Sequence, residues 1–387
     1  MDISAQQALQ RPILAILTMD DEEEQFRGNR SNFIDLIRTG HEMGVSVCVI
    51  TVKDLRPRSK RMIGHVYDLD TNTWSQRWIA PPHVIYNRIP TRQDEALPEV
   101  QLTLQACLKN PSIRLFNPMF FNKWTLFEWL NKAKTTAKYI PITMKMTNSA
   151  ELENVLKTYP IVYLKPIRGK AGKGIMKVQR SYLRQLRKPE FLLSVQETKG
   201  SQVIKSSTVT QLWNKVREQI EDDEEYIIQQ GIKLSRHKSR PFDLRVLVQK
   251  NAKGEWDLTG IGARLAGKLS ITTHVPRGGT IDDPEKLLAS SFGTDGARKI
   301  LGRAKKAALA IARQIEKKSG HLLGEMSMDL GVDIAGNIWF FEANSKPMKF
   351  DEPPIRKKSL ERIIHYSIHL LRLKHAKITD TNTRMML

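Results

Sequence analysis

Residues 327–344 read Ser-Met-Asp-Leu-Gly-Val-Asp-Ile-Ala-Gly-Asn-Ile-Trp-Phe-Phe-Glu-Ala-Asn, and this stretch predicts a β-hairpin. Two apolar segments, at 322–330 and 338–342, flank the polar turn at 333–337. Outward from the hairpin, further apolar segments predict the strands 226–230, 242–249 and 256–269. Two long helical patterns interrupt this region, at 296–319 and 360–373. The C-terminal half is therefore predicted to be a mostly antiparallel sheet interrupted by two helices.

The same hairpin brings acidic side chains together. With Ala335 and Gly336 at the centre of the turn, Asp329 lies directly opposite Glu342, with their Cβ atoms about 5 Å apart. Asn344 follows two residues later and points to the same face. Like charges placed opposite each other are destabilising unless a cation offsets them, and two carboxylates with an amide oxygen are ligands that suit Mg²⁺. The alternative is a polar stripe facing solvent, and a three-residue turn would shift the pairing by one residue.

A second chemical feature is the glycine-rich loop 166–174, Pro-Ile-Arg-Gly-Lys-Ala-Gly-Lys-Gly, between the predicted strands 161–165 and 175–179. Its glycines leave backbone N–H groups accessible beside two lysines, a combination that phosphate oxygens favour. The loop is not a Walker A motif, because the order of residues differs and a strand follows it. Lys165 ends the apolar strand, where a buried lysine is costly without an anion. The alternative is a basic hairpin turn.

Composition and charge narrow the class of protein. The 387 residues are 40% hydrophobic and 27% charged, which excludes disorder, collagen and coiled coil. A net charge of +21 favours anionic partners, but no nucleic-acid-binding motif is present, so no specific nucleic acid is expected. Cys48 and Cys107 lie among apolar neighbours and are predicted to be free, buried thiols. Residues 1–10 lack the pattern of a secretory signal and no segment predicts a membrane span, which favours a cytoplasmic protein.

The chain divides into two predicted domains. Residues 1–116 alternate strands and helices, typical of a small α/β layer domain, and no dinucleotide fingerprint follows the first strand. The strands are expected at 12–18, 45–51, 84–86 and 114–116, with a hairpin at 65–79 and helices at 32–43 and 95–108. Residues 117–387 form the second domain, with a small subdomain at 117–230 that holds the glycine loop. The C-terminal subdomain at 231–387 holds the acidic hairpin.

Taken in order, the candidate residues resemble an ATP-grasp ligase over about residues 117–373. The series is Lys123, Lys165-Pro, the glycine loop, Tyr-Ile-Ile-Gln-Gln-Gly-Ile at 226–232, Asp-Leu-Arg at 243–245, Arg264, Arg277-Gly-Gly, Asp329 and Glu342-Ala-Asn344. More narrowly, the chain resembles the YheC/YheD endospore-coat-associated ATP-grasp family, whose N-terminal layer domain and Phe-Asp-Leu-Arg and Phe-Glu-Ala-Asn stretches it shares. The resemblance implies an α/β plus α+β architecture, with a pre-ATP-grasp-like layer domain before a two-subdomain ATP-grasp fold.

The resemblance also implies a role for each matching residue. Those expected to contact the nucleotide are Lys123, Lys165, Gly169, Lys170, Gly172, Lys173, Gly174, Gln229, Gln230 and Ile232. Of these, the first two lysines would hold the α- and β-phosphates, the glycine loop would close over the triphosphate, and 229–232 would line the adenine hinge. Arg245, Arg264 and Arg277 would face the γ-phosphate and the transferred group. Asp329, Glu342 and Asn344 would hold two Mg²⁺ ions, with Mn²⁺ as the alternative, and His274 is a further candidate at the phosphate end.

The implied function is an ATP- and Mg²⁺-dependent carboxylate–amine, or thiol, ligase that acts through an acyl phosphate. Its substrate would be an acidic small molecule, amino acid or peptide, in a spore-coat context with a coat protein as a partner. The hinge departs from the common pattern, because Gln229 and Gln230 stand where an acidic residue often lies. The alternative is a nucleotide-binding coat protein with a structural or assembly role and no turnover.

Overall fold

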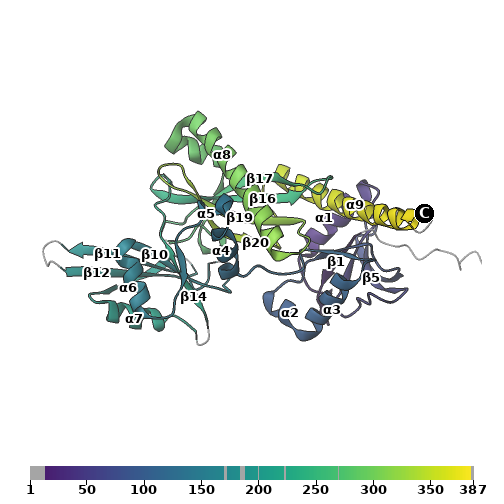
Figure 1. The fold of residues 1–387 in the computed structure, drawn as a ribbon, viewed down its shortest axis with the longest axis horizontal. Helices are drawn as coiled ribbons and strands as arrows, with labels where there is room; N and C mark the ends of the chain where they lie inside the picture. The colour runs from purple at the N-terminus through teal and green to yellow at the C-terminus, as the bar shows by residue number, and fades with distance from the viewer. Residues whose placement is uncertain are drawn as a thin grey trace, which may run out of the picture.

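The computed structural model describes residues 14–169, 172–183, 188–198, 200–221, 224–268 and 270–384. Within these ranges the chain forms three six-stranded sheets, and Figure 1 shows them in a row, with the third sheet between the other two. Strands β2 (Asp20–Asp21) and β3 (Gln25–Phe26) form a small separate hairpin. The described helices include none long and apolar enough to cross a membrane.

The first sheet has the order β6-β5-β4-β1-β7-β8 and forms the N-terminal layer. Its strands are β1 (Leu14–Thr18), β4 (Val47–Thr51), β5 (Met62–Asp68), β6 (Thr73–Ile79), β7 (Val84–Asn87) and β8 (Arg114–Phe116). Strand β1 pairs in parallel with β4 and β7, while β5 and β6 form the predicted antiparallel hairpin. The helices of this layer are α1 (Arg30–Glu42), α2 (Arg92–Ala96) and α3 (Pro98–Lys109). The expected α/β layer is therefore present.

One predicted helix of this layer is divided. The sequence pattern indicates one helix over 95–108, whereas the structure has α2 and α3 separated at Leu97. Leu97 adopts φ −59° and ψ 136°, which is not helical. The reason is Pro98, because a proline ring disfavours the helical conformation of the residue before it. Pro98 then occupies the first turn of α3, where its missing N–H costs nothing.

The second sheet has the order β13-β12-β11-β10-β14-β9. Its strands are β9 (Thr143–Lys145), β10 (Ile161–Pro166), β11 (Met176–Leu183), β12 (Lys188–Gln196), β13 (Ser201–Ser206) and β14 (Tyr226–Gln230). Helices α6 (Ser149–Thr158) and α7 (Val209–Arg217) pack their apolar side chains against one face, and the side chain of Asn148 caps the N-terminus of α6. Strands β12 and β13 and helix α7 had no predicted counterpart. The glycine loop joins β10 to β11.

The third sheet has the order β18-β17-β16-β19-β20, with β15 also pairing β16. Its strands are β15 (Arg236–His237), β16 (Arg240–Lys250), β17 (Trp256–Leu265), β18 (Thr280–Asp282), β19 (Glu325–Val332) and β20 (Ile338–Asn344). Around it lie α4 (Lys123–Asn131), α5 (Lys134–Ala137), the 3₁₀ turn η1 (Val275–Arg277) and the long helix α8 (Pro284–Ser319). Helix α8 starts twelve residues before its predicted start and is broken at Gly293, which has φ 69° and ψ 169°.

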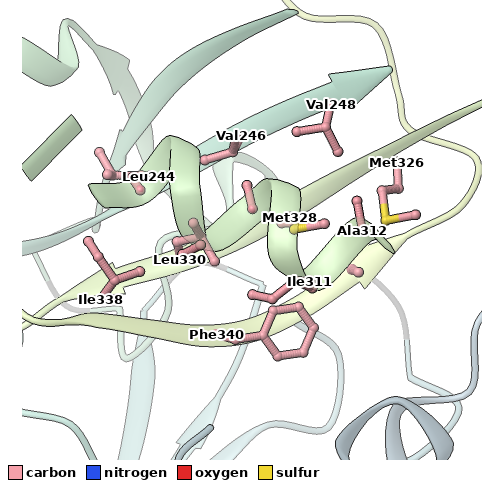
Figure 2. Close-up of a cluster of buried hydrophobic side chains, with 14 of the residues drawn as sticks. Leu244, Val246, Val248, Ile311, Ala312, Met326, Met328, Leu330, Ile338 and Phe340 are labelled. Atoms are coloured by element: carbon pink, nitrogen blue, oxygen red, sulfur yellow. The ribbon is translucent and has the colours of Figure 1, made fainter. Parts of the chain in front are cut away.

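The two faces of the third sheet differ in chemistry because side chains alternate along a strand. Leu244, Val246 and Val248 of β16 point with Met328 and Phe340 toward α8, and all are fully buried. Figure 2 shows these side chains around Ile311 and Ala312 of α8. The intervening residues of β16 and β19 therefore point to the opposite face, where the candidate site lies.

The C-terminal helix α9 (Pro353–Arg384) returns to the N-terminal layer. Its Ile363, Ile364, Tyr366 and Leu370 belong to the same buried cluster as residues of β1, α1 and β4. Figure 1 shows α9 beside α1, far from the second sheet. The N-terminal layer thus completes its core with the C-terminal end of the chain.

Candidate functional site

The polar face of the third sheet carries a row of charged residues from four neighbouring strands. Arg245 of β16 pairs with Asp329 of β19, and Asp329 pairs with Glu342 of β20. On the other side, Asp243 of β16 pairs with Arg264 of β17. The strand register therefore gathers three acids and two arginines on one face, and their segments are up to 99 residues apart in the sequence.

The predicted pairing of Asp329 with Glu342 is confirmed, but the reason given for it is wrong. The loop has three residues, 334–336, and it is closed by a hydrogen bond from the Asp333 N–H to the Asn337 carbonyl at 3.1 Å. This loop shifts the pairing by one position, so that Val332 lies opposite Ile338. A β-bulge next to Asp329 then shifts the pairing back and restores the two acids to facing positions.

Phe341 is the extra residue of this bulge. Its ring covers Gly331, where an added Cβ would lie 2.5 Å from the ring Cζ. The same ring lies 5.3 Å from the ammonium of Lys165. The bulge therefore places an aromatic ring and the Glu342 carboxylate side by side toward the second sheet, which a regular strand would point to opposite faces.

Arg264 is held between two carboxylates. Its Nε and Nη2 donate to Asp243 at 3.2 Å each, and Nη2 lies 2.7 Å from Asp329 Oδ2. Thr273 also donates its hydroxyl to Asp243. Burial opposes ionisation of Asp329, but Arg264 and His274 outweigh it, so the pKa of Asp329 lies below its usual value. Asp329 is therefore ionised at neutral pH and fixed in orientation.

Two lysines face this cluster, Lys123 from α4 and Lys165 from β10 of the second sheet. Lys123, the first residue of α4, donates to the Gly169 carbonyl at 3.1 Å and lies 3.8 Å from Glu342. Lys165 donates to Gln229 Oε1 at 2.6 Å. Burial, reinforced by the charge of Lys123, lowers the pKa of Lys165 to about 8 although Glu342 and other acids favour its charged form. A bound anion would therefore stabilise the charged form of Lys165.

The glycine loop contacts the segment that holds His274 and Arg277. Gly172 has φ +74°, and an added Cβ would lie 2.8 Å from His274 Cδ2 and 3.6 Å from Arg277 Cγ. Gly174 also has a positive φ, and its carbonyl accepts from Tyr226 at 3.0 Å. At Gly172 the loop therefore meets the segment between β17 and β18 at a position where a larger residue would be crowded and strained.

The remaining predicted residues have contacts of other kinds. Arg245 places its guanidinium 5.0 Å from the Phe350 ring centroid, and Asn344 ends β20 opposite Ser327. Gln230 accepts from the Ile142 N–H at 3.2 Å, and Ile232 follows β14. Exposed Lys173 pairs with Glu221 at 3.3 Å. Lys170 lies outside the described residues.

The donor set suits a hard cation. Asp329 Oδ2 forms an ion pair with Arg264 at 2.7 Å. The ion pair of Glu342 with Lys123 is longer, at 3.8 Å, so the Glu342 carboxylate is held less tightly. Asn344 adds an amide oxygen from the same face. Across the described ranges no group of three or more His, Cys, Asp or Glu side chains is arranged to hold a metal. Two carboxylates and an amide nevertheless fit Mg²⁺, which binds few protein ligands and keeps other positions for phosphates.

Sequence reasoning missed two contributions to this site. Asp243 belongs to a motif that was noted, but its pairing with Arg264 depends on the register of β16 and β17. Arg92, from the N-terminal layer, lies 5.2 Å from the Phe120 ring centroid. Burial lowers the pKa of Arg92, and the negative charge of Glu342 raises it in part. The guanidinium of Arg92 therefore lies close enough to the acidic hairpin to interact with it. Local sequence around Arg92 carries no signal for this position.

Comparison with solved structures identifies the fold. D-alanyl-alanine synthetase A from Vibrio cholerae O1 biovar eltor str. N16961 matches with a TM-score of 0.53 and 12% identity, over 94% of this chain and 99% of that one. The ATP-grasp ligase PsnB, complexed with minimal precursor, Mg and ADP, matches with a TM-score of 0.52 and 11% identity, over 94% and 99%. These matches confirm the predicted ATP-grasp architecture, which covers most of the chain.

Sequence comparison identifies the family. The model of YheC/D like ATP-grasp matches residues 112–370. Endospore coat-associated protein YheD of Bacillus subtilis (strain 168) is 31% identical over 324 residues, which are 82% of this chain and 68% of that protein. The chain therefore belongs to the YheC/D-like ATP-grasp family, and the resemblance found in the sequence is confirmed.

Proposed function

We propose that the protein is an ATP- and Mg²⁺-dependent ligase that joins a carboxylate to an amine, or to a thiol, through an acyl phosphate. In the first step a carboxylate oxygen attacks the γ-phosphorus, the bond to the β-phosphate oxygen breaks, and ADP leaves. In the second step the amine nitrogen bonds to the acyl carbon, phosphate leaves, and the nitrogen loses a proton. The products are an amide, ADP and phosphate.

The observation that supports this proposal most strongly is the facing arrangement of lysines and acids. Lys123 bridges the two sides, since it contacts the glycine loop and lies 3.8 Å from Glu342. Lys165 has its pKa lowered to about 8 mainly by burial, and a polyphosphate would relieve that cost. A protein without a nucleotide site gains nothing from Lys165 held in this way, because its buried charge costs stability without a ligand.

Each group has a distinct proposed role. Lys123 and Lys165 donate to the α- and β-phosphates, while the loop from Gly169 to Gly174 excludes water above them. The hinge at 229–232 borders the adenine, although Gln229 also orients Lys165. Positioning and charge neutralisation supply most of the catalysis in phosphoryl transfer, so the fixed orientation of these donors matters more than their basicity.

The polar face of the third sheet would hold the transferred group. Arg264 is immobilised by Asp243 and Asp329, so its charge is in place before the γ-phosphate binds. Arg245 and Arg277 face the same group. Asp329, Glu342 and Asn344 would hold Mg²⁺, which when bound neutralises charge on the phosphate oxygens.

The proposed substrate class is an amino acid or peptide, and the proposed setting is the spore coat. The setting follows from the name of the relative YheD, an endospore coat-associated protein. The substrate class follows from the ligases of similar fold. A second candidate, a coat assembly protein that binds nucleotide without turnover, has the same site and predicts binding alone.

The test is incubation of the full chain with ATP, Mg²⁺ and a library of amino acids and peptides. Phosphate release and product mass are measured together, and Lys165→Met serves as the inactive control. Release that depends on one library member, with a product lighter by one water than the sum of its parts, supports the ligase. Binding of a non-hydrolysable ATP analogue without release for any member supports the assembly role, and absence of nucleotide binding refutes both.

A further inference from the structure

A groove with a volume of about 820 Å³ lies on the N-terminal layer, between the segment that follows β4 and the C-terminal end of α3. Its volume is in the range of ligand-binding pockets. None of the residues proposed above to bind nucleotide or metal belongs to it, so the groove is a separate candidate site. Its lining residues are Arg56, Pro57, Arg58, Ser59, Ala106, Lys109, Asn110 and Pro111.

The two walls of this groove are joined to each other. Asn110 follows the last residue of α3, and its side-chain amide donates to the Pro57 carbonyl at 2.8 Å. Within the segment after β4, the Ser59 hydroxyl donates to the Arg61 carbonyl at 2.6 Å. Leu55 anchors this segment, since it is buried in the same core cluster as residues of α3. A groove whose walls are fixed before binding loses little conformational entropy when a ligand enters it.

The segment 53–61 carries an excess of positive charge. It reads Lys-Asp-Leu-Arg-Pro-Arg-Ser-Lys-Arg, and its single acid, Asp54, already accepts from the Thr51 hydroxyl at 2.7 Å. Arg56 and Arg58, with Lys109 on the other wall, are exposed and form no ion pair with any residue that the structure describes. An anionic ligand could therefore contact three cations without breaking an existing ion pair.

An apolar strip on α3 leads into the groove. Leu102, Ala106 and Lys109 are spaced at i, i+4 and i+7, so they lie on one face of the helix. All three are exposed, and Leu102 is 72% exposed. Leu102 lies one turn from Ala106, and Pro57 and Pro111 add further apolar surface to the wall of the groove. A ligand that fits both features is anionic and also carries apolar groups.

We propose that this groove is a docking site for an acidic segment of a partner protein, with carboxylates on the cations of the groove and an apolar side chain on Leu102. Charge complementarity favours an acidic ligand. The apolar strip favours a peptide over a nucleic acid or a polyphosphate, which would bind mainly through phosphates. Because the cations are exposed, the affinity should fall as salt is added. This docking site does not depend on the ligase function proposed above.

The first experiment measures the binding of labelled peptides to the full chain by fluorescence anisotropy at low salt. The main probe repeats Glu-Glu-Leu, and two comparison peptides carry Gln in place of Glu or Gly in place of Leu. The main probe should bind at least about tenfold more tightly than the Gln peptide and severalfold more tightly than the Gly peptide. The proposal is overturned if the main probe does not bind, or if inorganic polyphosphate or an oligonucleotide of equal charge binds as tightly.

Charge reversal tests the location of the site. The double variant Arg56→Glu/Arg58→Glu should weaken binding of the main probe at least about tenfold, because two attractive contacts become repulsive. Lys109→Glu repeats the test from the other wall. The control, Lys299→Glu/Arg303→Glu on α8, changes the net charge equally at two exposed residues without an ion pair in the described ranges, and should leave binding nearly unchanged. Equal losses in both double variants would show attraction to net charge alone and overturn the proposal.

Leu102→Ala tests the apolar contact. It should weaken binding of the main probe severalfold but not of the Gly peptide, whereas Ile334→Ala, at a 58% exposed residue of the β19–β20 turn, should change neither. Equal losses for both peptides, or no loss for either, would contradict the contact. Each variant should melt at the parental temperature and bind a non-hydrolysable ATP analogue as the parent does, because every substituted side chain is exposed and lies outside the proposed nucleotide site.

A second copy of the chain is the alternative occupant, because residues 20–24 read Asp-Asp-Glu-Glu-Glu and lie in the β2–β3 hairpin. Sedimentation of the full chain across a range of concentrations distinguishes the two occupants. If the groove takes a partner protein, Glu22→Lys/Glu23→Lys should sediment as the parent does at every concentration. Self-association of the parent that this variant abolishes would assign the groove to the hairpin of a second copy and overturn the proposal.

Discussion

Replacement of Lys165 by methionine should stabilise the free protein and weaken ATP binding. The ammonium is partly buried, bonds to Gln229 at 2.6 Å, and lies 5.8 and 5.3 Å from the ring centroids of Tyr163 and Phe341. Burial is the main cause that lowers its pKa from 10.5 to about 8. Methionine keeps the apolar stem and its contacts with the rings, and it removes the charge and the hydrogen bond to Gln229.

The magnitude follows from the pKa. Below pH 8 both the folded and the unfolded chain hold the proton, so the folded chain carries the full cost of the charge, roughly 3 kcal/mol. Between pH 8 and 10.5 the unfolded chain binds more protons, so the stability of the parent rises with pH. After subtraction of the hydrogen bond to Gln229 and a discount for partial exposure, the variant should be more stable at neutral pH by about 1–2 kcal/mol.

Urea unfolding of parent and variant across neutral to alkaline pH measures this difference, which should shrink as pH rises through the lysine pKa. Calorimetry with a non-hydrolysable ATP analogue should show roughly ten- to hundredfold weaker binding, the value of a charge-assisted hydrogen bond. Lys157→Met is the control, because Lys157 is an exposed partner of Glu153 on α6. A variant that is less stable at every pH, with unchanged ATP affinity, would refute the reasoning and make Lys165 structural.

Three further results are expected. Without metal, Glu342→Gln should melt at or above the parental temperature, because Asp329 no longer faces a second negative charge. ADP production across a Mg²⁺ titration should collapse in this variant. Parental turnover at low Mg²⁺ would contradict the metal assignment. Asp243→Asn should lower the free energy of unfolding by about 3 kcal/mol, since it leaves buried Arg264 without one of its two carboxylates, and urea unfolding at neutral pH measures it. Gly172→Ala should weaken ATP binding severalfold in the same calorimetric assay, because its Cβ meets His274 at 2.8 Å and its φ is +74°; equal affinity would show that the loop need not close there.

The sequence was most informative where burial is periodic. Strand β14 has the predicted bounds, and β10, β16 and β20 are close to theirs, because alternating or continuous apolar residues mark a buried strand. Strand β13 was missed, since its largely exposed residues give weak alternation at the edge of the second sheet. Strand β12 was missed although its Phe191 and Leu193 are buried. Local pattern alone does not reveal a strand whose place depends on pairing with β11.

The candidate site, too, could be predicted from the sequence only in part. The facing of Asp329 and Glu342 was predicted, yet it depends on a bulge stabilised by the ring of Phe341 over Gly331, a contact that turn rules do not contain. The partners of Arg264 and the approach of Arg92 require the register of separate strands and the docking of the N-terminal layer. Motif order therefore identified the residue types, while tertiary packing set their partners.

The two faces of the third sheet explain how the chain tolerates such a site. Opposite the polar face, burial and then the charge of Lys123 lower the pKa of Lys165, and on the face itself two acids lie opposite each other; both arrangements cost stability until an anion and a cation bind. On the opposite face, Leu244, Val246, Met328 and Phe340 are fully buried under α8. Because successive side chains of a strand point to opposite faces, the strands that carry the charged residues also carry the core residues that fix their register. The core therefore offsets the cost of the site, and the charges stay in position for a ligand that neutralises them.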